Sequence, residues 1–280
     1  MRHLFSSLGS RLPVPAAVLA LALALAGCGG PGAGAGTEGV APSAAAGAQD
    51  VRAVAPATAD AGSEPNAAGE GGMDTPTAAT SASAATELPG LGPRTLAEIP
   101  DNARQVVVVT GKDKNSPESQ VVLYRRTDDA GWAAGHTWAA HNALKGWTDD
   151  HHAGDLHSPI GVFTLSDAGG LLADPGTKLP YDQSSSFTIG GTGFEGESLA
   201  GSFDYVVAID YNRKPGTSPL DWTRPLGTGR GGGIWLHVDH GGPTHGCVSL
   251  AQQHMKELLL TLDPALHPVI VMGDRASLER

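Results

Sequence analysis

Short β-branched and aromatic runs recur between residues 105 and 272, with clusters of glycine and proline between them. Runs of about 4–8 such residues between turn-forming clusters predict strands. Gln105–Val109 and Gln120–Arg126 flank a breaker at residues 115–117, so these two runs predict a hairpin. Further strands are expected at Trp132–Trp138, Ile160–Leu165, Phe203–Asp210, Gly233–Val238 and Pro268–Met272. Many strands and few helices predict a mainly β fold, either a β-sandwich or a barrel-like sheet.

One long segment has the period of an amphipathic helix. Its apolar residues are Ala251, Met255, Leu258, Leu259 and Leu262, which fall on one face of a helix. Ser249, followed three residues later by Gln252, has the pattern of a capping box, and Pro264 follows the end. We therefore predict a helix that begins just after Ser249.

The first 27 residues have the plan of a bacterial export signal. Arg2, His3 and Arg11 form a positive region, and Val14–Ala26 is an apolar run too short to span a bilayer. The run ends in Leu-Ala-Gly-Cys at residues 25–28, which resembles the lipobox of bacterial lipoproteins. The resemblance implies cleavage before Cys28 and lipid on its thiol. The alternative is an ordinary secretory signal that contains a cysteine by chance.

Residues 28–94 consist mainly of Ala, Gly, Ser, Thr and Pro, and residues 29–93 lack Phe, Trp and Tyr. Such a composition cannot bury enough apolar surface to offset the entropy of ordering. We interpret the segment as a disordered tether that spans on the order of 45 Å. Residues 95–275 form the expected folded domain. With lipid on Cys28, we expect an exported protein on the outer face of the cell membrane, with its domain reaching into the cell wall.

The formal net charge is -11, and no basic cluster stands out in the chain. Nucleic-acid binding depends on Lys and Arg that neutralise phosphates, so no nucleic-acid partner is expected. The two cysteines have different expected uses, because Cys28 carries lipid and Cys247 lies in the folded domain.

The most informative stretch runs from Ile234 to Leu262. Alternation along residues 233–238 puts His237 on one face of a strand with Trp235. A Gly-Gly-Pro loop then returns the chain toward His237, and Cys247 follows just ahead of the predicted helix. The N-terminus of a helix favours a thiolate. Backbone N–H groups of residues 245–247 can converge on an oxyanion, and Gly246 lets that backbone approach a substrate closely.

These residues resemble the L,D-transpeptidase catalytic domain, the YkuD family of bacterial cell-wall enzymes. The family pattern is an upstream histidine, a loop, and then Ser or Thr, a residue, Gly and Cys. The matching residues are His237 and Thr244-His245-Gly246-Cys247. A second stretch, Ser-Pro-Ile-Gly-Val-Phe at 158–163, is similar to the family's Thr-Pro-x-Gly-x-Phe.

The resemblance implies a thioester on Cys247 made from a peptidoglycan stem tetrapeptide and passed to an amine, which gives a 3→3 cross-link. It implies His237 as the general base, while His245 assists and Gly246 completes the catalytic loop. No cofactor and no metal are expected. Ser249 stands where many members carry Arg or Asn, and Val238 replaces a small or polar residue. A backbone carbonyl is therefore the expected partner of His237.

Four alternatives stay open from the sequence. Water as the acceptor makes the same site an L,D-carboxypeptidase. His237-x-x-His240, His245-x-Cys247 and the histidines at 151, 152 and 157 have spacings that suit zinc, as in a peptidoglycan hydrolase. The domain can also bind wall without catalysis, and Cys247 can be an inert buried residue. The simplest expectation for His240 is a solvated loop residue. For His151, His152 and His157 it is a polar loop near the mouth of the site, with substrate contact as the alternative.

Overall fold

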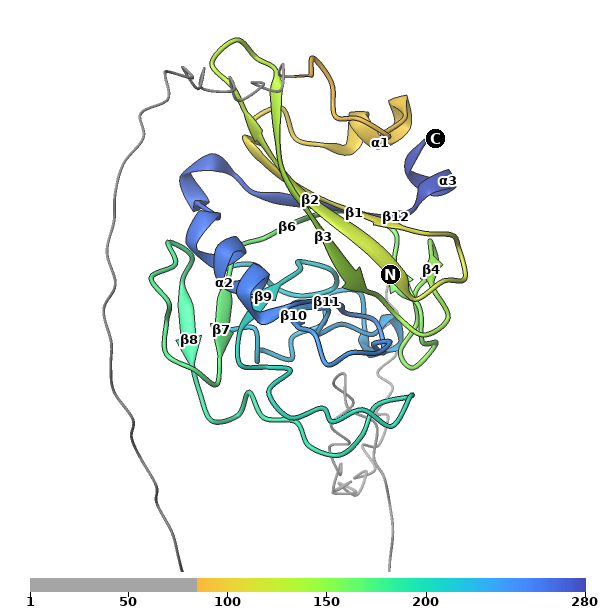
Figure 1. Ribbon diagram of the computed structural model, residues 1–280, viewed down its shortest axis with the longest axis vertical. Coiled ribbons are helices and arrows are strands. Elements are labelled where there is room, and N and C mark those ends of the chain that lie inside the picture. The colour runs from red at the N-terminus through yellow and green to blue at the C-terminus, as the bar shows by residue number, and fades with distance from the viewer. Residues whose placement is uncertain (1–84) are drawn as a thin grey trace, which may run out of the picture.

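The computed structural model describes residues 85–280 (Figure 1). The expected signal segment, Cys28 and most of the expected tether lie outside the described residues. Within residues 85–280, no helix has the length and apolar character needed to cross a bilayer.

Ten strands of the described region form one large curled sheet, in the order β6-β12-β1-β2-β3-β11-β10-β9-β7-β8 (Figure 1). The strands are β1 Gln105–Gly111, β2 Glu118–Arg126, β3 Trp132–His141, β6 Gly161–Thr164, β7 Ala168–Gly170, β8 Tyr181–Gln183, β9 Val206–Ala208, β10 Trp235–Val238, β11 Val248–Leu250 and β12 Val269–Asp274. A separate pair joins β4 Trp147–Thr148 to β5 Ser158–Pro159. The mainly β prediction is confirmed, with a barrel-like sheet instead of a two-sheet sandwich.

The predicted hairpin is confirmed, because β1 pairs antiparallel with β2. On its other side β1 pairs parallel with β12, which comes more than 150 residues later in the sequence. Both faces of β1 are buried. Val107 and Val109 face the main core, whereas Val106 and Val108 face a second apolar cluster. A strand covered on both faces reads as a continuous apolar run, and this explains the four consecutive valines.

The helices are short. They are α1 Pro93–Glu98, α2 Gln252–Thr261 and α3 Arg275–Leu278, with 3₁₀ turns at Thr228–Arg230 and Pro264–Leu266. The predicted apolar face of α2 is confirmed, since Met255, Leu258 and Leu259 are fully buried in the main core. Helices α1 and α3 lie on the opposite side of the sheet from α2 (Figure 1).

The predicted start of α2 is wrong. Its N-cap is Ala251, and Ser249 lies inside β11. Because the Ser249 hydroxyl donates to the Asp239 carboxylate at 2.7 Å, it is not placed to cap a helix. Cys247 therefore precedes a strand, and the helix begins five residues after it. The dipole of α2 acts mainly within its first turn, so it does not explain a reactive thiol at Cys247.

The packed region begins ahead of residue 95. Leu88 is 3% exposed and packs in the second apolar cluster with Val106 and Leu278. The Gly92 amide donates to the Leu278 carbonyl at 2.8 Å, which ties the start of this region to the C-terminal helix. Composition alone grouped these residues with the preceding Ala- and Gly-rich segment, although their leucines are core residues.

Candidate active site

His237 lies on β10, Cys247 directly precedes the neighbouring parallel strand β11, and the two residues share one face of the sheet. Strands β10 and β11 pair with Leu236 opposite Val248 and His237 opposite Ser249. Side chains alternate along each strand, so Cys247, which directly precedes β11, shares the face of Ser249 and His237. The alternation predicted from the sequence is therefore confirmed: Leu236 faces the main core, and Trp235 packs in the cluster that contains Cys247.

His237 is 2% exposed, and its ring is held in one orientation. Its Nδ1–H donates to the Val238 carbonyl oxygen at 2.9 Å, which fixes the tautomer that leaves Nε2 as an acceptor. This is the backbone partner expected from the sequence. The Phe203 ring packs edge-on against the imidazole, with ring centroids 5.4 Å apart. Burial lowers the pKa of His237 from 6.5 to about 4, so the ring is neutral near pH 7 and able to accept a proton.

Cys247 is fully buried. Its Sγ donates to the Gly233 carbonyl at 3.6 Å, and its side chain belongs to an apolar cluster with Phe187, Phe203 and Trp235. Phe187 and Phe203 lie in the long connection between β8 and β9. In this conformation the thiol is therefore covered by aromatic side chains.

The loop before Cys247 is bound to the end of β3. The Thr244 amide donates to the Asn142 carbonyl at 3.0 Å, and the Thr244 carbonyl accepts from the Leu144 amide at 3.0 Å. The Thr244 hydroxyl donates to the Cys247 carbonyl at 2.6 Å. This threonine, which matches the Ser or Thr of the family pattern, thus closes the loop on itself and fastens it to the sheet.

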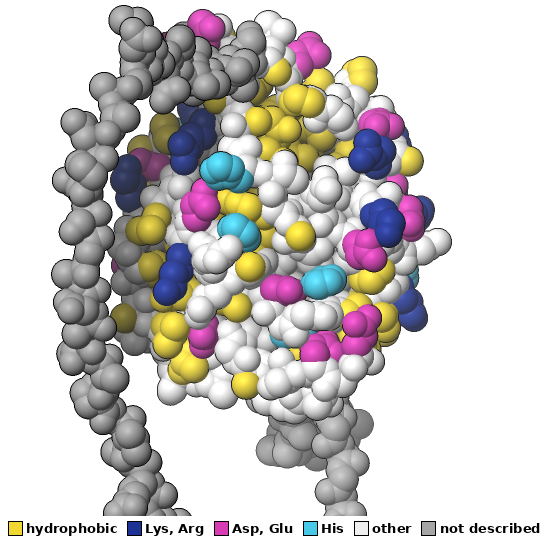
Figure 2. All heavy atoms as spheres, in the orientation of Figure 1, with side chains coloured by type: hydrophobic (Ala, Val, Ile, Leu, Met, Phe, Trp, Pro, Cys, Tyr) yellow, Lys and Arg dark blue, Asp and Glu magenta, His cyan; other side chains and the backbone are white. Residues whose placement is uncertain are grey.

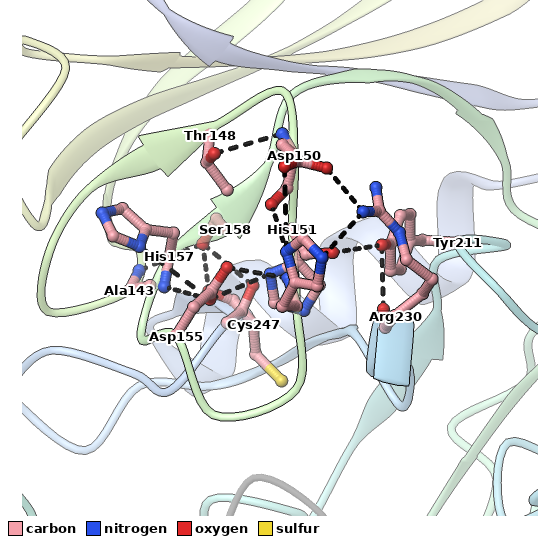
Figure 3. Close-up of polar contacts among 12 residues, drawn as sticks. Ala143, Thr148, Asp150, His151, Asp155, His157, Ser158, Tyr211, Arg230 and Cys247 are labelled. Carbon is pink, nitrogen blue, oxygen red and sulfur yellow. Dashed lines mark hydrogen bonds and ion pairs between the residues drawn. The ribbon is translucent and has the colours of Figure 1, made fainter. Parts of the chain in front are cut away.

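Ser158 joins the two sequence motifs, which lie 88 residues apart. Its hydroxyl donates to the Gly246 carbonyl at 2.8 Å and accepts from the Ala143 amide at 3.1 Å (Figure 3). A peptide unit is planar and trans, so a carbonyl held on one side sends the N–H of the next residue to the other side. The carbonyls of Thr244 and Gly246 are both held by the β3–β5 side of the loop. The N–H groups of His245 and Cys247 therefore point away from that side, as an oxyanion site requires.

Gly246 packs closely against other parts of the protein. A Cβ at this position would lie 3.0 Å from Ile234 Cδ1 and 3.5 Å from the His157 carbonyl oxygen. The sequence interpretation stressed close approach to a substrate, whereas the neighbours that a side chain would meet are protein atoms. The small residue lets the loop pack tightly on the start of β10.

His245 and His240 are more confined than the sequence indicated. His245 is partly buried and packs on Phe194 with ring centroids 4.6 Å apart, and burial lowers its pKa. His240 was expected to be solvated. Instead its side chain is 5% exposed, its Nδ1 lies 3.1 Å from a Glu197 carboxylate oxygen, and its ring stacks on His237 at 5.9 Å. The connection between β8 and β9 supplies Phe194 and Glu197, so this segment covers all three histidines.

A second polar cluster, which contains His151, Asp155 and Arg230, lies near Cys247 (Figure 3). His151 is 4% exposed, its Nδ1 lies 3.2 Å from a carboxylate oxygen of Asp155, and its ring packs edge-on against Tyr211. Burial lowers the pKa of His151. His152 and His157 lie nearer solvent. All three histidines lie in the loop between β4 and β5, as expected, but His151 is buried within it.

The zinc alternative has no ligand set in the described region. No three His, Cys, Asp or Glu side chains of residues 85–280 are grouped so that they could hold a metal ion. The rings of His237 and His240 stack nearly parallel, at 11°, and their Nδ1 atoms are engaged by Val238 and Glu197. Two ligands of one metal would direct ring nitrogens at a common point.

Sequence reasoning missed the pair formed by His141 and Asp239, whose Nδ1 and Oδ1 atoms lie 2.8 Å apart. These residues are 98 positions apart and match no motif, so only the fold brings them together. His141 ends β3, and a histidine at the end of a strand beside the site was the one available signal.

Comparison with known proteins gives three findings. No curated protein matches the sequence. Among solved structures, the helical cell shape determining protein Pgp2 from Campylobacter jejuni is similar at 15% identity and a TM-score of 0.36, over 62% of this chain and 49% of that protein. This chain thus spans about half the length of that structure. The family model for the YkuD L,D-transpeptidase catalytic domain matches residues 95–271, which is more than half of the chain. The chain belongs to the YkuD family of L,D-transpeptidase catalytic domains.

Proposed function

We propose that this protein is a cysteine-dependent L,D-transpeptidase that acts on peptidoglycan stem peptides. The observation that carries the proposal is the placement of His237 and Cys247 on one sheet face, within the family-matched region. The neutral His237 ring, with Nδ1 bound to a backbone carbonyl, is suited to act as a general base through Nε2.

In the first half-reaction, His237 accepts the thiol proton and Cys247 Sγ attacks the carbonyl carbon of the third stem residue. The C–S bond forms, the amide bond to D-Ala breaks, and the leaving amine takes the proton from His237. The N–H groups of His245 and Cys247 stabilise the oxyanion. In the second half-reaction, the amine of another stem attacks the thioester and gives a proton to His237. The new amide bond forms, the C–S bond breaks, and His237 returns the proton to the sulfur of Cys247. Water in place of that amine gives the carboxypeptidase reaction.

Stem peptides reach Cys247 only if its cover moves, since the thiol has no exposed surface. We infer that the connection between β8 and β9, which carries Phe187 and Phe203, is displaced when substrate binds.

In the same proposal, lipid on Cys28 tethers the domain to the outer face of the membrane. Metabolic labelling with a fatty-acid analogue tests the tether: the label should be lost in Cys28→Ser, and a label that persists would refute lipidation at this residue.

Product analysis tests the reaction itself. Purified protein is incubated with tetrapeptide stems, and the products are resolved by mass spectrometry. We expect D-Ala release and 3→3 dimers from the wild type and neither from Cys247→Ala. D-Ala release without dimers would support the carboxypeptidase instead. Turnover by Cys247→Ala would refute the cysteine mechanism.

A further inference from the structure

Three directly paired positions run across neighbouring strands beside the candidate site. His141 on β3 pairs with Ser249 on β11, and Ser249 pairs with His237 on β10. Directly paired residues project from the same face of a sheet. His141 therefore shares the face of His237 and Cys247, two strands away from His237.

Asp239 connects this row. Its Oδ1 accepts from the Ser249 hydroxyl at 2.7 Å and from His141 Nδ1 at 2.8 Å, and its amide donates to the Leu250 carbonyl at 2.7 Å. Asp239 follows the strand that carries His237, and Ser249 comes two residues after Cys247. The contacts thus bind together the two ends of the loop that separates His237 from Cys247.

The charges in this network reinforce one another. Burial opposes ionisation of Asp239, but hydrogen bonds from His141 and Ser249 outweigh it and lower the pKa of Asp239 to about 2. The hydrogen bond to Asp239 raises the pKa of His141 above 6.5, although burial opposes it. The negative charges of Glu195 and Glu118 also favour the protonated form of His141. The network is thus an ion pair at mildly acidic pH.

The pair is reached by water. The side chains of His141 and Asp239 are 31% and 24% exposed, and both line a groove of about 650 Å³. Lys112, Glu118 and Arg275 also line it. Lys112 lies 2.7 Å from Glu118, which offsets its charge. Protons can therefore exchange with His141 in the folded protein.

We propose that His141 and Asp239 are positioning residues that act through Ser249 to hold the His237 strand end and the Cys247 loop in the reactive arrangement. The role in catalysis rests on the proposed function of Cys247. The hydrogen bonds of the pair reach Ser249 and the Leu250 carbonyl, and the charge of Asp239 also acts on His237, whose pKa it raises against the effect of burial. Loss of the pair therefore disturbs the geometry of the loop. Small displacements of reacting groups are costly, up to about 100-fold in rate for 1 Å.

Two variants of His141 separate positioning from simple structural support. His141→Ala removes the donor to Asp239, whereas His141→Asn keeps an N–H near the position of Nδ1 but cannot be charged. We expect the Cys247 acylation rate constant to fall about tenfold or more in His141→Ala with KM within about twofold. His141→Asn should restore most of that rate at neutral pH. Ser249→Ala should lower the same acylation rate constant, by a smaller factor than His141→Ala.

The pH profile adds a readout that packing alone would not change. Because the pKa of His141 is raised in the folded state, the stabilisation that protonated His141 gives to the network is complete at a pH below the unfolded-state pKa near 6.5. This stabilisation is lost as pH rises through the folded-state pKa. The wild-type acylation rate should therefore decline on the alkaline side, and this decline should be absent in His141→Asn. Equal losses of rate and thermal stability in both variants, or wild-type rates in both, would overturn the positioning role.

Nuclear magnetic resonance tests the network without requiring activity. Backbone amides of residues 239–247 should shift in parallel with the titration of His141 in the wild type and remain constant in His141→Asn. A wild type that never acylates Cys247 would refute the proposed function, while the amide titration would still decide whether the network holds the loop. Amide chemical shifts of the wild type that do not change as His141 titrates would overturn the positioning role.

Discussion

At the scale of single residues, the state of His237 decides how the site behaves with pH. Burial of its ring lowers the pKa to about 4, although the hydrogen bond from Nδ1 to the Val238 carbonyl acts in the opposite direction. A base with this pKa is already unprotonated at neutral pH. It remains competent well below the ordinary histidine range.

We therefore expect the acid limb of kcat/KM that belongs to His237 to lie near pH 4. A limb near pH 6.5 would contradict the buried, neutral ring. The same burial works against the fold in acid, because the unfolded chain binds a proton near pH 6.5 and the folded one only near pH 4. Stability should fall across that window, so circular dichroism at each pH must accompany the rates. His237→Gln, with the base removed, serves as the control.

Ser158 provides a second test at this scale. Ser158→Ala removes the hydroxyl that binds the Gly246 carbonyl and the Ala143 amide, so two buried polar groups lose their partner. We expect a loss of about 1–3 kcal/mol in the free energy of unfolding. The rate of Cys247 acylation should also fall, because the direction of the Cys247 N–H is no longer fixed. Ser158→Thr keeps the hydroxyl and is the matched control. Urea unfolding and adduct formation measure both effects, and equal behaviour of the two variants would contradict this role.

Predictions from side-chain alternation and from motifs were correct for several residues. They were wrong where the partner of a residue comes from a distant part of the chain. Apolar alternation along residues 233–238 gave the correct faces for Trp235 and Leu236, because a strand of period two needs no other information. The solvated reading of His240 failed because its partner, Glu197, lies 43 residues away. Local sequence cannot identify such a partner.

At the scale of elements, the missed strand β11 changes the chemistry expected of Cys247. Val248–Leu250 is three residues long and leads directly into the periodic segment of α2, so Ser249 looked like a helix cap. Its pairing with β10 and β3 is what makes it a strand. A short strand that depends on two distant neighbours carries no local signature.

The connection between β8 and β9 contributes Phe187 and Phe203 to the cluster that buries Cys247, and we predict that it limits access to the thiol. Phe187 is 1% exposed and packs in the Cys247 cluster. Phe187→Leu should loosen this cover and raise the rate at which iodoacetamide alkylates Cys247. Phe163→Leu removes an aromatic ring that packs on Tyr211 in another part of the core, and it is the matched control. We expect faster alkylation only in Phe187→Leu. Equal rates in both variants would show that this cover does not limit access.

At the scale of the whole molecule, sheet order differs from chain order. Strand β1 pairs with β12 from the far end of the chain, and β6 forms the sheet edge beyond β12. Strand existence could be predicted from apolar runs, but this order depends on long-range packing. This order places β3, β11 and β10 next to one another beside the site. It thereby brings His141, Ser249 and His237 into one row.

The face shown in Figure 2 carries charged side chains of both signs. Figure 2 shows Lys and Arg interspersed with Asp and Glu on the face viewed, without a continuous basic patch. The formal net charge of -11 points the same way. Phosphate backbones are bound by clustered positive charge, which this face does not offer.

The most direct test of the account is the intact mass of the protein after incubation with tetrapeptide stem. Formation of a thioester with loss of D-Ala adds the mass of the stem's acyl group to the protein. Proteolytic digestion and mass spectrometry should locate this added mass on Cys247. We expect this adduct in the wild type, a much slower adduct in His237→Gln, and none in Cys247→Ala. A wild-type chain that turns over or binds the stem with no adduct on Cys247 would contradict the central claim.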